Sequence, residues 1–263
     1  GFMAIGGYAS AILATNYNWP PLAGVLAAMV ISVLCALALS LVTGRLRGHY
    51  LALATLAFGL LVDSLAVGLI SLTGGPSGLV GVPSFSIAGF SFDTSASMYW
   101  LALGLAAVLV VALEGGMRSG FGRSLKAIRT DQLAAAALGI NVGRVKVIAL
   151  CIAAALASLS GSLYAFEFHF LSPDMVATPR SFELIAMLVL GGEGTLVGGL
   201  FGSMVLTILP TLVQDLAVYK TAAEGALLVG TFLFLPEGLF GRFAIWLQSV
   251  HRPLAKPGAE PAE

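Results

Sequence analysis

Charge is what this sequence has least of. Charged residues make up 10% of the chain against 58% hydrophobic residues, and the mean hydropathy is +0.97. No Asp, Glu, Lys or Arg precedes Arg45, and five later stretches are also free of charge: Ser64–Phe92, Thr94–Leu113, Val147–Phe166, Gly194–Gln214 and Gly225–Pro236. The first four of these stretches reach or exceed the ~20 residues that a helix needs to cross ~30 Å of hydrocarbon, and Gly225–Pro236 is shorter. A soluble domain is therefore excluded.

The lack of charge also restricts the secondary structure. Because no water reaches the hydrocarbon core, the backbone of a spanning segment must form its hydrogen bonds within a helix or a closed barrel. The alternation of apolar and polar residues that a membrane barrel shows is missing. The sequence therefore predicts an all-α, polytopic helical membrane protein.

Patterns typical of catalysis and metal binding are missing as well. The sequence has no HExxH, no GxSxG and no cluster of His, Cys and carboxylates, and neither Cys35 nor Cys151 has metal-ligand spacing. We therefore predict neither an enzyme nor a cofactor site. A net charge of zero argues against nucleic-acid binding. Since no GxxxxGK[ST] occurs, any ATP hydrolysis that drives the protein belongs to another subunit.

The chain does contain a series of expected membrane spans. The full-length ones are Pro21–Val42, Tyr50–Leu72, Met98–Leu113, Val145–Phe166 and Leu196–Val213, and shorter apolar runs are Gly1–Thr15, Leu184–Leu190 and Gly225–Leu235. We expect about seven to eight transmembrane segments, short or broken helices included, in a transmembrane domain of residues 1–240 with a cytoplasmic tail of residues 241–263. The chain opens without an initiator Met or an apparent signal peptide, so we expect missing upstream sequence and treat this number as a minimum.

The basic residues predict the orientation in the membrane. Gly44–His49, Glu114–Lys146 and the C-terminal tail hold eleven of the thirteen Lys and Arg residues. The positive-inside rule places all three regions in the cytoplasm. This topology closes if Thr178–Gly191 counts as a short crossing, whereas a re-entrant segment there would misplace the C-terminus.

The longest water-compatible stretch is Gly122–Lys146, and six basic residues lie between Arg118 and Lys146. It predicts a helix over Leu125–Leu138 with Ser124 as its N-cap and Gly139 just past its end. At helical spacing the basic residues share one face, and Leu125 and Ile128 share another. Two interpretations stay open at this point: a solvated loop that only fixes the topology, or a short helix presented to a soluble partner.

Two glycine-rich breaks, Gly74–Gly81 and Gly191–Gly198, match at five of eight positions. Glycine-interrupted segments in corresponding places can mark a transport pathway or an internal repeat. Close helix packing or turn geometry is the alternative, and we favour it because Gly, Leu and Val are common in this chain.

Two ionisable residues stand apart from the basic loop. Asp63 is the one acid deep within an expected span, which suggests a proton or ion relay. The spans offer it no second titratable partner, so we favour a position near the outer interface where it hydrates. His169 is interpreted as a loop residue on the outer side, with substrate contact as the alternative.

Six segments, in order along the chain, carry a family resemblance. They are GFMAIGGYASAIL, GHYLALATLAFG, TGGPSGLVGVP, GRSLKAIRTDQLAAAALGINVGRVKVIAL, SFELIAMLVLGGEGTLVGGLFG and FLPEGLFG. Together they resemble the inner-membrane permease subunits of ABC importers for branched-chain amino acids, specifically the LivM type. There are two departures: the acid after the AF pair comes only at Asp63, and residues 134–137 are all Ala, without the acidic residue often found there.

The resemblance implies a multi-pass permease in the bacterial inner membrane that moves branched-chain amino acids. The implied partners are a second homologous permease subunit, two ABC ATPase subunits that bind the ATP, and an extracytoplasmic substrate-binding protein. Within a coupling loop of residues 115–144, it assigns ATPase coupling to Arg123, Ala127, Ile128, Arg129, Ala134, Ala135 and Gly139. It assigns the surroundings of the translocation path to Thr55, Phe58, Gly74, Gly75, Gly78, Gly191, Gly192, Gly194 and Thr195. The alternatives are a permease for urea or short-chain amides and a self-contained secondary transporter.

Overall fold

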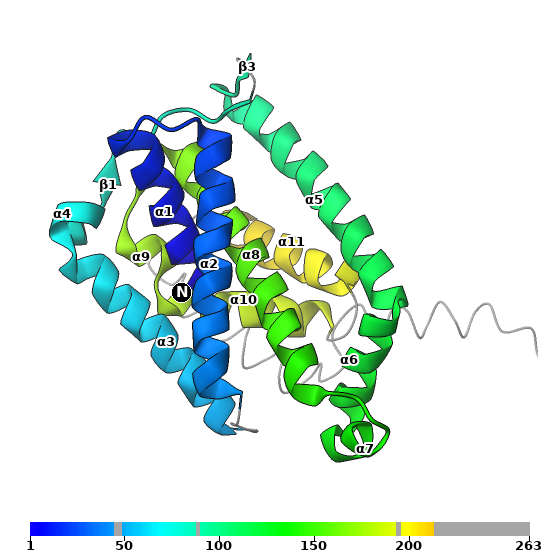
Figure 1. The fold of residues 1–263 in the computed structure, drawn as a ribbon. Coiled ribbons are helices and arrows are strands. Elements are labelled where there is room, and N and C mark those ends of the chain that lie inside the picture. The colour runs from blue at the N-terminus through cyan, green and yellow to red at the C-terminus, as the bar shows by residue number, and fades with distance from the viewer. Residues whose placement is uncertain (45–48, 88–89, 193–195, 213–263) are drawn as a thin grey trace, which may run out of the picture. The chain divides into compact units, whose positions relative to one another are not determined.

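The computed structural model describes residues 1–44, 49–87, 90–192 and 196–212 (Figure 1). The chain forms two compact units, residues 1–180 and residues 181–263, which we describe one at a time. Helices dominate the described residues, and four of these helices are long and apolar enough to cross a membrane: Pro21–Thr43, Tyr50–Gly68, Ser95–Arg118 and Val142–Phe168. The prediction of a polytopic helical membrane protein is therefore confirmed. Of the expected spans, Gly225–Leu235 lies outside the described residues.

The centre of the first unit is a bundle of α1 (Phe2–Asn16), α2 (Pro21–Thr43) and α8 (Val142–Phe168), which lie side by side in Figure 1. The three helices meet through small residues, and the fully buried positions include Ala11, Ala28, Ala36 and Ala154. Lipid tails are as apolar as leucine, so close packing of small residues is what draws membrane helices together. The prediction of a helix over Pro21–Val42 is confirmed within one residue, because an uninterrupted apolar run leaves no place for it to end.

The contact between α1 and α8 is the closest in this bundle. A Cβ on Gly6 would overlap the backbone of Ser158, and one on Gly161 would overlap the carbonyl oxygen of Met3. The hydroxyl of Ser162 lies 3.1 Å from the carbonyl oxygen of Gly6 and 2.9 Å from that of Ser158, within reach to donate to either. The glycines of α1 and α8 therefore let two backbones come into direct contact.

The expected span Tyr50–Leu72 is shorter in the structure and breaks near its end. α3 (His49–Gly68) stops, Leu69 leaves helical geometry with φ −85° and ψ 58°, and a single turn, α4 (Ile70–Thr73), follows. The hydroxyl of Thr73 lies 2.7 Å from the carbonyl oxygen of Ala66 and 2.9 Å from that of Leu69. The Thr73 hydroxyl therefore reaches back across the break to Ala66, whereas the Leu69 carbonyl oxygen also accepts from the backbone N–H groups of Leu72 and Thr73.

The glycine- and proline-rich segment after α4 is an ordered connection. It contains the 3₁₀ turn η1 (Gly75–Ser77), the strand β1 (Leu79–Val80) and a hairpin of β2 (Ser86–Ile87) and β3 (Phe90–Ser91). β1 pairs antiparallel with β4 (Phe170–Leu171), which follows α8, with Leu79 opposite Leu171. These short pairings attach the connection to the end of the helical bundle.

α5 (Ser95–Arg118) leads away from this connection and differs from the bundle helices in its surroundings. Of its residues, all of which the structure describes, only Met98 is buried. Both α5 and α8 are longer than the expected spans Met98–Leu113 and Val145–Phe166, because polar residues at their ends continue the helices beyond the apolar runs. The short helix α9 (Pro173–Val176) follows β4 and precedes α10.

The second unit contains most of α10 (Thr178–Gly191) and all of α11 (Leu196–Leu212). The two helices approach closely at glycines: a Cβ on Gly191 would overlap the carbonyl oxygen of Gly198, and one on Gly202 would overlap that of Met187. Ala186, Met187, Leu190 and Leu206 form its buried apolar cluster. At 1.5 Å per residue α10 is about 21 Å long, which is shorter than the ~30 Å hydrocarbon core.

Candidate coupling surface and path residues

The basic segment between α5 and α8 folds as two short helices joined at Asp131. α6 (Gly120–Thr130) and α7 (Gln132–Ala137) replace the single helix expected over Leu125–Leu138. The side chain of Asp131 accepts hydrogen bonds from the backbone N–H groups of Leu133 at 2.7 Å and Ala134 at 3.3 Å, so it caps α7 and ends α6. The prediction of one continuous helix is therefore wrong.

The expected N-cap of this segment is wrong and its expected end is confirmed. Ser124 lies inside α6, where its hydroxyl donates back to the carbonyl oxygen of Gly120 at 3.1 Å. Gly139 has φ +82°, its N–H bonds to the Ala136 carbonyl oxygen, and the N–H of Ile140 bonds to that of Ala135. This pair of bonds is a Schellman motif, which needs a left-handed residue at the position that Gly139 occupies.

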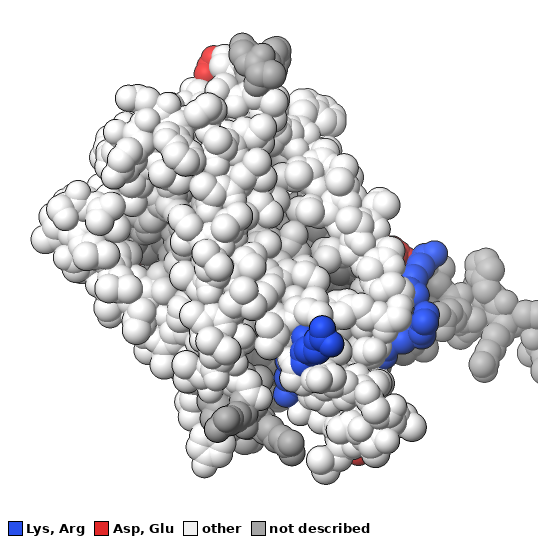
Figure 2. Space-filling model, viewed as in Figure 1, with Lys and Arg blue, Asp and Glu red and all other residues white. Residues whose placement is uncertain are grey.

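α6 has the two faces that its spacing predicts. Ile128 is buried at 8% exposure and Leu125 is half-buried, while Arg123, Lys126 and Arg129 are exposed. Figure 2 shows lysine and arginine side chains gathered at the end of the first unit where α6, α7 and the start of α8 lie. The same end of the unit carries the C-terminal end of α2 and the start of α3, as the positive-inside assignment requires (Figure 1).

α7 presents a different surface from α6. Ala135 is buried at 2% exposure, whereas Ala134 beside it is exposed, and the side chains of Leu133 and Leu138 are 69% and 80% exposed. The exposed leucines around α7 therefore form an apolar surface next to the basic face of α6. Such a combination of apolar anchors and peripheral charge is typical of a surface that binds a partner protein.

Side-chain hydrogen bonds connect α6 and α7 to the flanking helices α5 and α8. α6 begins two residues after α5 ends, and the Arg123 guanidinium donates to the carbonyl oxygen of Arg118 at 3.3 Å. The Lys146 ammonium on α8 donates to the side-chain oxygen of Gln132 on α7 at 3.0 Å. A force applied to α6 or α7 therefore reaches both α5 and α8.

The structure places the coupling candidates in this compact pair of helices. Arg123, Ala127, Ile128 and Arg129 lie on α6, Ala134 and Ala135 lie on α7, and Gly139 forms the turn after it. Ile128 and Ala135 are buried and hold the helices in place, whereas Arg123, Arg129 and Ala134 are exposed. Their role in coupling stays a prediction.

The path candidates on α3 lie far from the first glycine-rich break. The exposed Thr55 donates its hydroxyl hydrogen bond to the Ala52 carbonyl oxygen at 2.9 Å, and the ring of Phe58 lies 4.9 Å from that of Phe2. Thirteen residues of α3 separate Thr55 from Gly68, which is about 20 Å along the helix axis. The structure therefore does not bring Thr55 together with Gly74.

The two glycine-rich breaks have different geometries. Gly74, Gly75 and Gly78 form turns with φ of +76°, +60° and +74°, and a Cβ on Gly78 would lie 2.6 Å from the carbonyl oxygen of Leu171. Gly191 is helical and packs α10 against α11, and Gly192 follows with φ +105°. Turn geometry and close packing thus account for the glycines that the structure describes. Gly194 and Thr195 lie outside the described residues.

Asp63 has a partner that the sequence does not reveal. Its carboxylate oxygen Oδ2 accepts hydrogen bonds from the backbone N–H of Thr178 at 2.9 Å and from the Thr178 hydroxyl at 2.6 Å. Thr178 is the first residue of α10, so Asp63 satisfies a donor at a helix N-terminus. The two residues are 115 positions apart, which explains why no local pattern links them.

His169 holds the end of α8 to the connection after α4. It has φ +52° and ψ +17°, which ends the helix, and its ring nitrogen Nδ1 lies 3.0 Å from the carbonyl oxygen of Val82. The N–H of Val82 in turn donates to the carbonyl oxygen of His169 at 3.3 Å. The expectation of a loop position next to α8 is met, and the side chain has a structural role there.

The structure is that of a multi-pass membrane protein: membrane-length helices pack through a core of small residues. An exposed basic pair of helices, α6 and α7, which we call the elbow, joins two of them. Comparison with protein families then makes the class specific. The chain belongs to the family described as the permease component of the branched-chain amino acid transport system, which matches residues 1–236.

Similar curated proteins include two kinds of permease from Escherichia coli. The chain is 30% identical over 267 residues to the high-affinity branched-chain amino acid transport system permease protein LivM, which covers 91% of this chain and 62% of LivM. It is 30% identical over 155 residues to LivH of the same system, which covers 58% of this chain and 49% of LivH. No solved structure matches the chain.

A tyrosine transport system permease protein of Clostridioides difficile is also similar. It is 29% identical over 207 residues, which covers 79% of this chain and 61% of that protein. The chain thus spans 62% of the length of the LivM proteins that it matches.

Proposed function

We propose that the chain is the membrane-embedded permease subunit of an ABC importer for branched-chain amino acids in the bacterial inner membrane. Membership of the permease family over residues 1–236 carries this proposal. The exposed elbow of α6 and α7, placed between two membrane-length helices, supports it, because a permease driven by separate ATPases needs such a surface. The chain acts as a conduit and not as an enzyme, and it binds no cofactor of its own.

In this mechanism two ABC ATPase subunits bind ATP and dock on the coupling loop of residues 115–144. Closure of the ATPase pair moves α6 and α7. Because the elbow is fastened to α5 and α8, those helices carry the movement into the membrane as rigid elements. A second, homologous permease subunit completes the path, and an extracytoplasmic binding protein delivers the substrate.

The substrate assignment rests on relatives that span more sequence than this chain. The LivM and LivH relatives transport branched-chain amino acids by name, and the Clostridioides difficile relative transports tyrosine. A specificity set largely by the binding protein explains how similar permeases serve different side chains. Urea and short-chain amides are the competing substrates, and uptake competition distinguishes them.

Docking is tested by charge reversal at Arg123 and Arg129 together. Both side chains are exposed on α6, so we expect R123E/R129E to reduce co-purification with the ATPase subunits from detergent. Asp93, exposed after β3, offers a control in which D93K reverses a charge outside the coupling loop. Unchanged recovery of the ATPases with R123E/R129E would contradict the docking assignment.

Transport is tested with the complete importer in proteoliposomes. We expect ATP-dependent uptake of radiolabelled leucine that excess isoleucine or valine competes and excess urea does not. The permease subunits without ATPases should accumulate no leucine against a gradient. Accumulation without the ATPases would show a self-contained transporter, and competition by urea alone would show the amide-type permease.

A further inference from the structure

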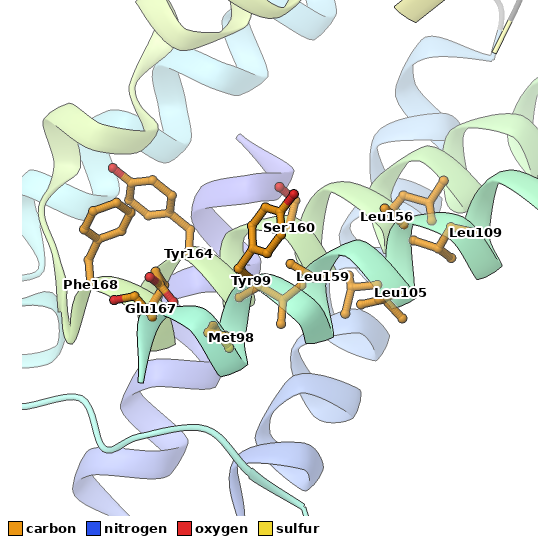
Figure 3. Close-up of a pocket in the computed structure, with 14 residues that line it drawn as sticks. Met98, Tyr99, Leu105, Leu109, Leu156, Leu159, Ser160, Tyr164, Glu167 and Phe168 are labelled. Atoms are coloured by element: carbon orange, nitrogen blue, oxygen red, sulfur yellow. The ribbon is translucent and has the colours of Figure 1, made fainter. Parts of the chain in front are cut away.

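α5 and α8 diverge and enclose a groove with a volume of about 420 Å³ (Figure 3). This volume lies near the lower end of the roughly 300–1,000 Å³ typical of small-molecule pockets. One end of the groove holds Glu167 and Tyr99, and the other end holds Leu105, Leu109 and Leu156 (Figure 3). The groove is therefore apolar along its length and acidic at one end.

Glu167 is the charged residue of this lining, and the residue is half-buried. Within the described residues it forms no hydrogen bond and no ion pair, whereas the carboxylate of Asp63 accepts two hydrogen bonds from Thr178. A partly desolvated carboxylate without a partner is costly near a membrane and calls for a positive charge. Glu167 therefore differs from Asp63 in having its charge available to a ligand.

The position of Glu167 on α8 adds to this preference for a cation. It lies in the last turn of α8, which ends at Phe168. The C-terminal end of a helix carries partial negative charge, so a carboxylate there is disfavoured and a bound cation is favoured. The negative charge of the side chain and the helix dipole thus act together at the same end of the groove.

Hydroxyl groups also line the groove. Ser160, Tyr164 and Glu167 follow one another at helical spacing on α8, and Tyr99 on α5 lines the same groove. These hydroxyls can donate hydrogen bonds to an anionic group. The groove therefore offers an acceptor for an ammonium group at its acidic end, hydroxyl donors for a carboxylate in its lining, and a surface of leucines.

We propose that this groove is a binding site for an aliphatic α-amino acid, with Glu167 binding its ammonium group and the leucines contacting its side chain. The proposal rests on the proposed function, since it places a binding site for the transported substrate in this subunit. Charge complementarity selects a ligand with a cationic head and an apolar tail. A lipid in the groove would give a different outcome in the experiment.

The experiment measures protection of a cysteine at the acidic end. Cys35 and Cys151 are replaced by Ala, and Ser95, which lines the groove, is replaced by Cys in the full chain in nanodiscs. Ala96→Cys is the matched control, because Ala96 is exposed, adjacent in sequence and not part of the lining. The probes are L-leucine, 3-methylbutylamine, which lacks the carboxylate, and 4-methylpentanoate, which lacks the ammonium group.

Leucine and 3-methylbutylamine should slow maleimide labelling of S95C, and 4-methylpentanoate should not. At a ligand concentration of twice the Kd the rate should fall about threefold. E167Q should abolish the protection by the amine, whereas E114Q, at the other end of α5 and outside the lining, should retain it. Labelling of A96C should not respond to any probe. A102C is a second reporter in the lining if S95C does not fold.

Equal protection by 4-methylpentanoate, or protection that survives E167Q, would overturn the proposal. Labelling that ignores all three probes but follows the phosphatidylethanolamine content of the nanodisc would show a lipid in the groove and would also overturn it. Leucine uptake by the complete importer without any protection would reject the groove alone. Absence of leucine uptake by an importer that carries another substrate would reject the proposed function itself.

Discussion

Two faces of α8 differ in the size of their side chains; we call them the packed face and the groove face. One face consists of the buried residues Ala154, Ser158, Gly161, Ser162 and Ala165, and it packs against α1 and α2. The other borders the groove toward α5 with larger side chains such as Leu156, Tyr164 and Phe168. In lipid, exposing a leucine costs little, so stability must come from the face where small residues allow backbones to meet. The groove face is then free to serve binding.

The largest loss of stability is expected from a substitution at Gly161, where the packed face of α8 leaves no space for a side chain. Because a Cβ there would overlap the carbonyl oxygen of Met3, Gly161→Ala should separate α1 from α8 and reduce the free energy of unfolding by about 3 kcal/mol. Thermal unfolding in detergent, followed by circular dichroism, measures this loss.

The matched control for this substitution is Gly104 on α5. A Cβ at Gly104 has nothing within 4 Å, so Gly104→Ala should not destabilise the protein and can stabilise it by up to about 1 kcal/mol through helix propensity. Equal melting temperatures for the two variants would show that the α1–α8 contact does not limit stability.

A smaller effect is expected at Asp63. Asp63→Ala removes the acceptor of both Thr178 hydrogen bonds and should cost about 1–2 kcal/mol, the usual range for a lost helix cap. Asp63→Asn keeps an acceptor and should restore most of this stability together with leucine uptake by the complete importer. Loss of uptake in D63N with ATP hydrolysis intact would instead favour Asp63 as a coupling-ion site.

A substitution at Ser162 measures how much a single hydrogen bond on the packed face contributes to stability. Ser162→Ala removes the hydroxyl within 3.1 Å of the Gly6 carbonyl oxygen, and such interhelical bonds contribute about 0.6 kcal/mol in membranes. Ser160→Ala on the groove face removes the same hydroxyl group and should leave the melting temperature unchanged. A larger loss in S160A than in S162A, in the same melting assay, would reverse the roles of the two faces.

The elements that the sequence predicts well are those determined by residues close together in the chain. α2 and α8 follow from charge-free runs, because a backbone in lipid has no alternative to the helix. The two faces of α6 follow from spacing, and the turn after α7 follows from Gly139, since each depends on residues within a few positions. Local rules are sufficient for these elements.

Features that depend on distant contacts could not be predicted. The break at Leu69 follows Gly68, but a single glycine does not reveal that Thr73 bonds back across the break to Ala66. The groove needs α5 and α8 to diverge, which neither helix encodes alone. Asp131 is an exception: as a helix-capping residue inside the basic segment it was a local signal for two helices instead of one.

The smallest effect is expected in the hairpin of β2 and β3, which lies outside the helical bundle. The hydroxyl of Ser91 donates to the carboxylate of Asp93 at 2.5 Å, and this bond, with one from Ser84, holds the pKa of Asp93 below its ordinary value. Because the lowered pKa belongs to the folded state, these bonds stabilise it above the unfolded pKa, and the contribution is lost as the pH falls through the folded pKa.

Ser91→Ala should therefore raise the pKa of Asp93 toward the ordinary value, and Ser84→Ala should raise it by less, since Ser91 makes the larger contribution. Carboxyl ¹³C chemical shifts of labelled Asp93 across a pH titration measure both changes. The melting temperature at neutral pH should stay the same, because the carboxylate is fully exposed. A fall in melting temperature comparable to that of S162A would show that the hairpin is coupled to the packed face, so that local changes at this end reach the bundle.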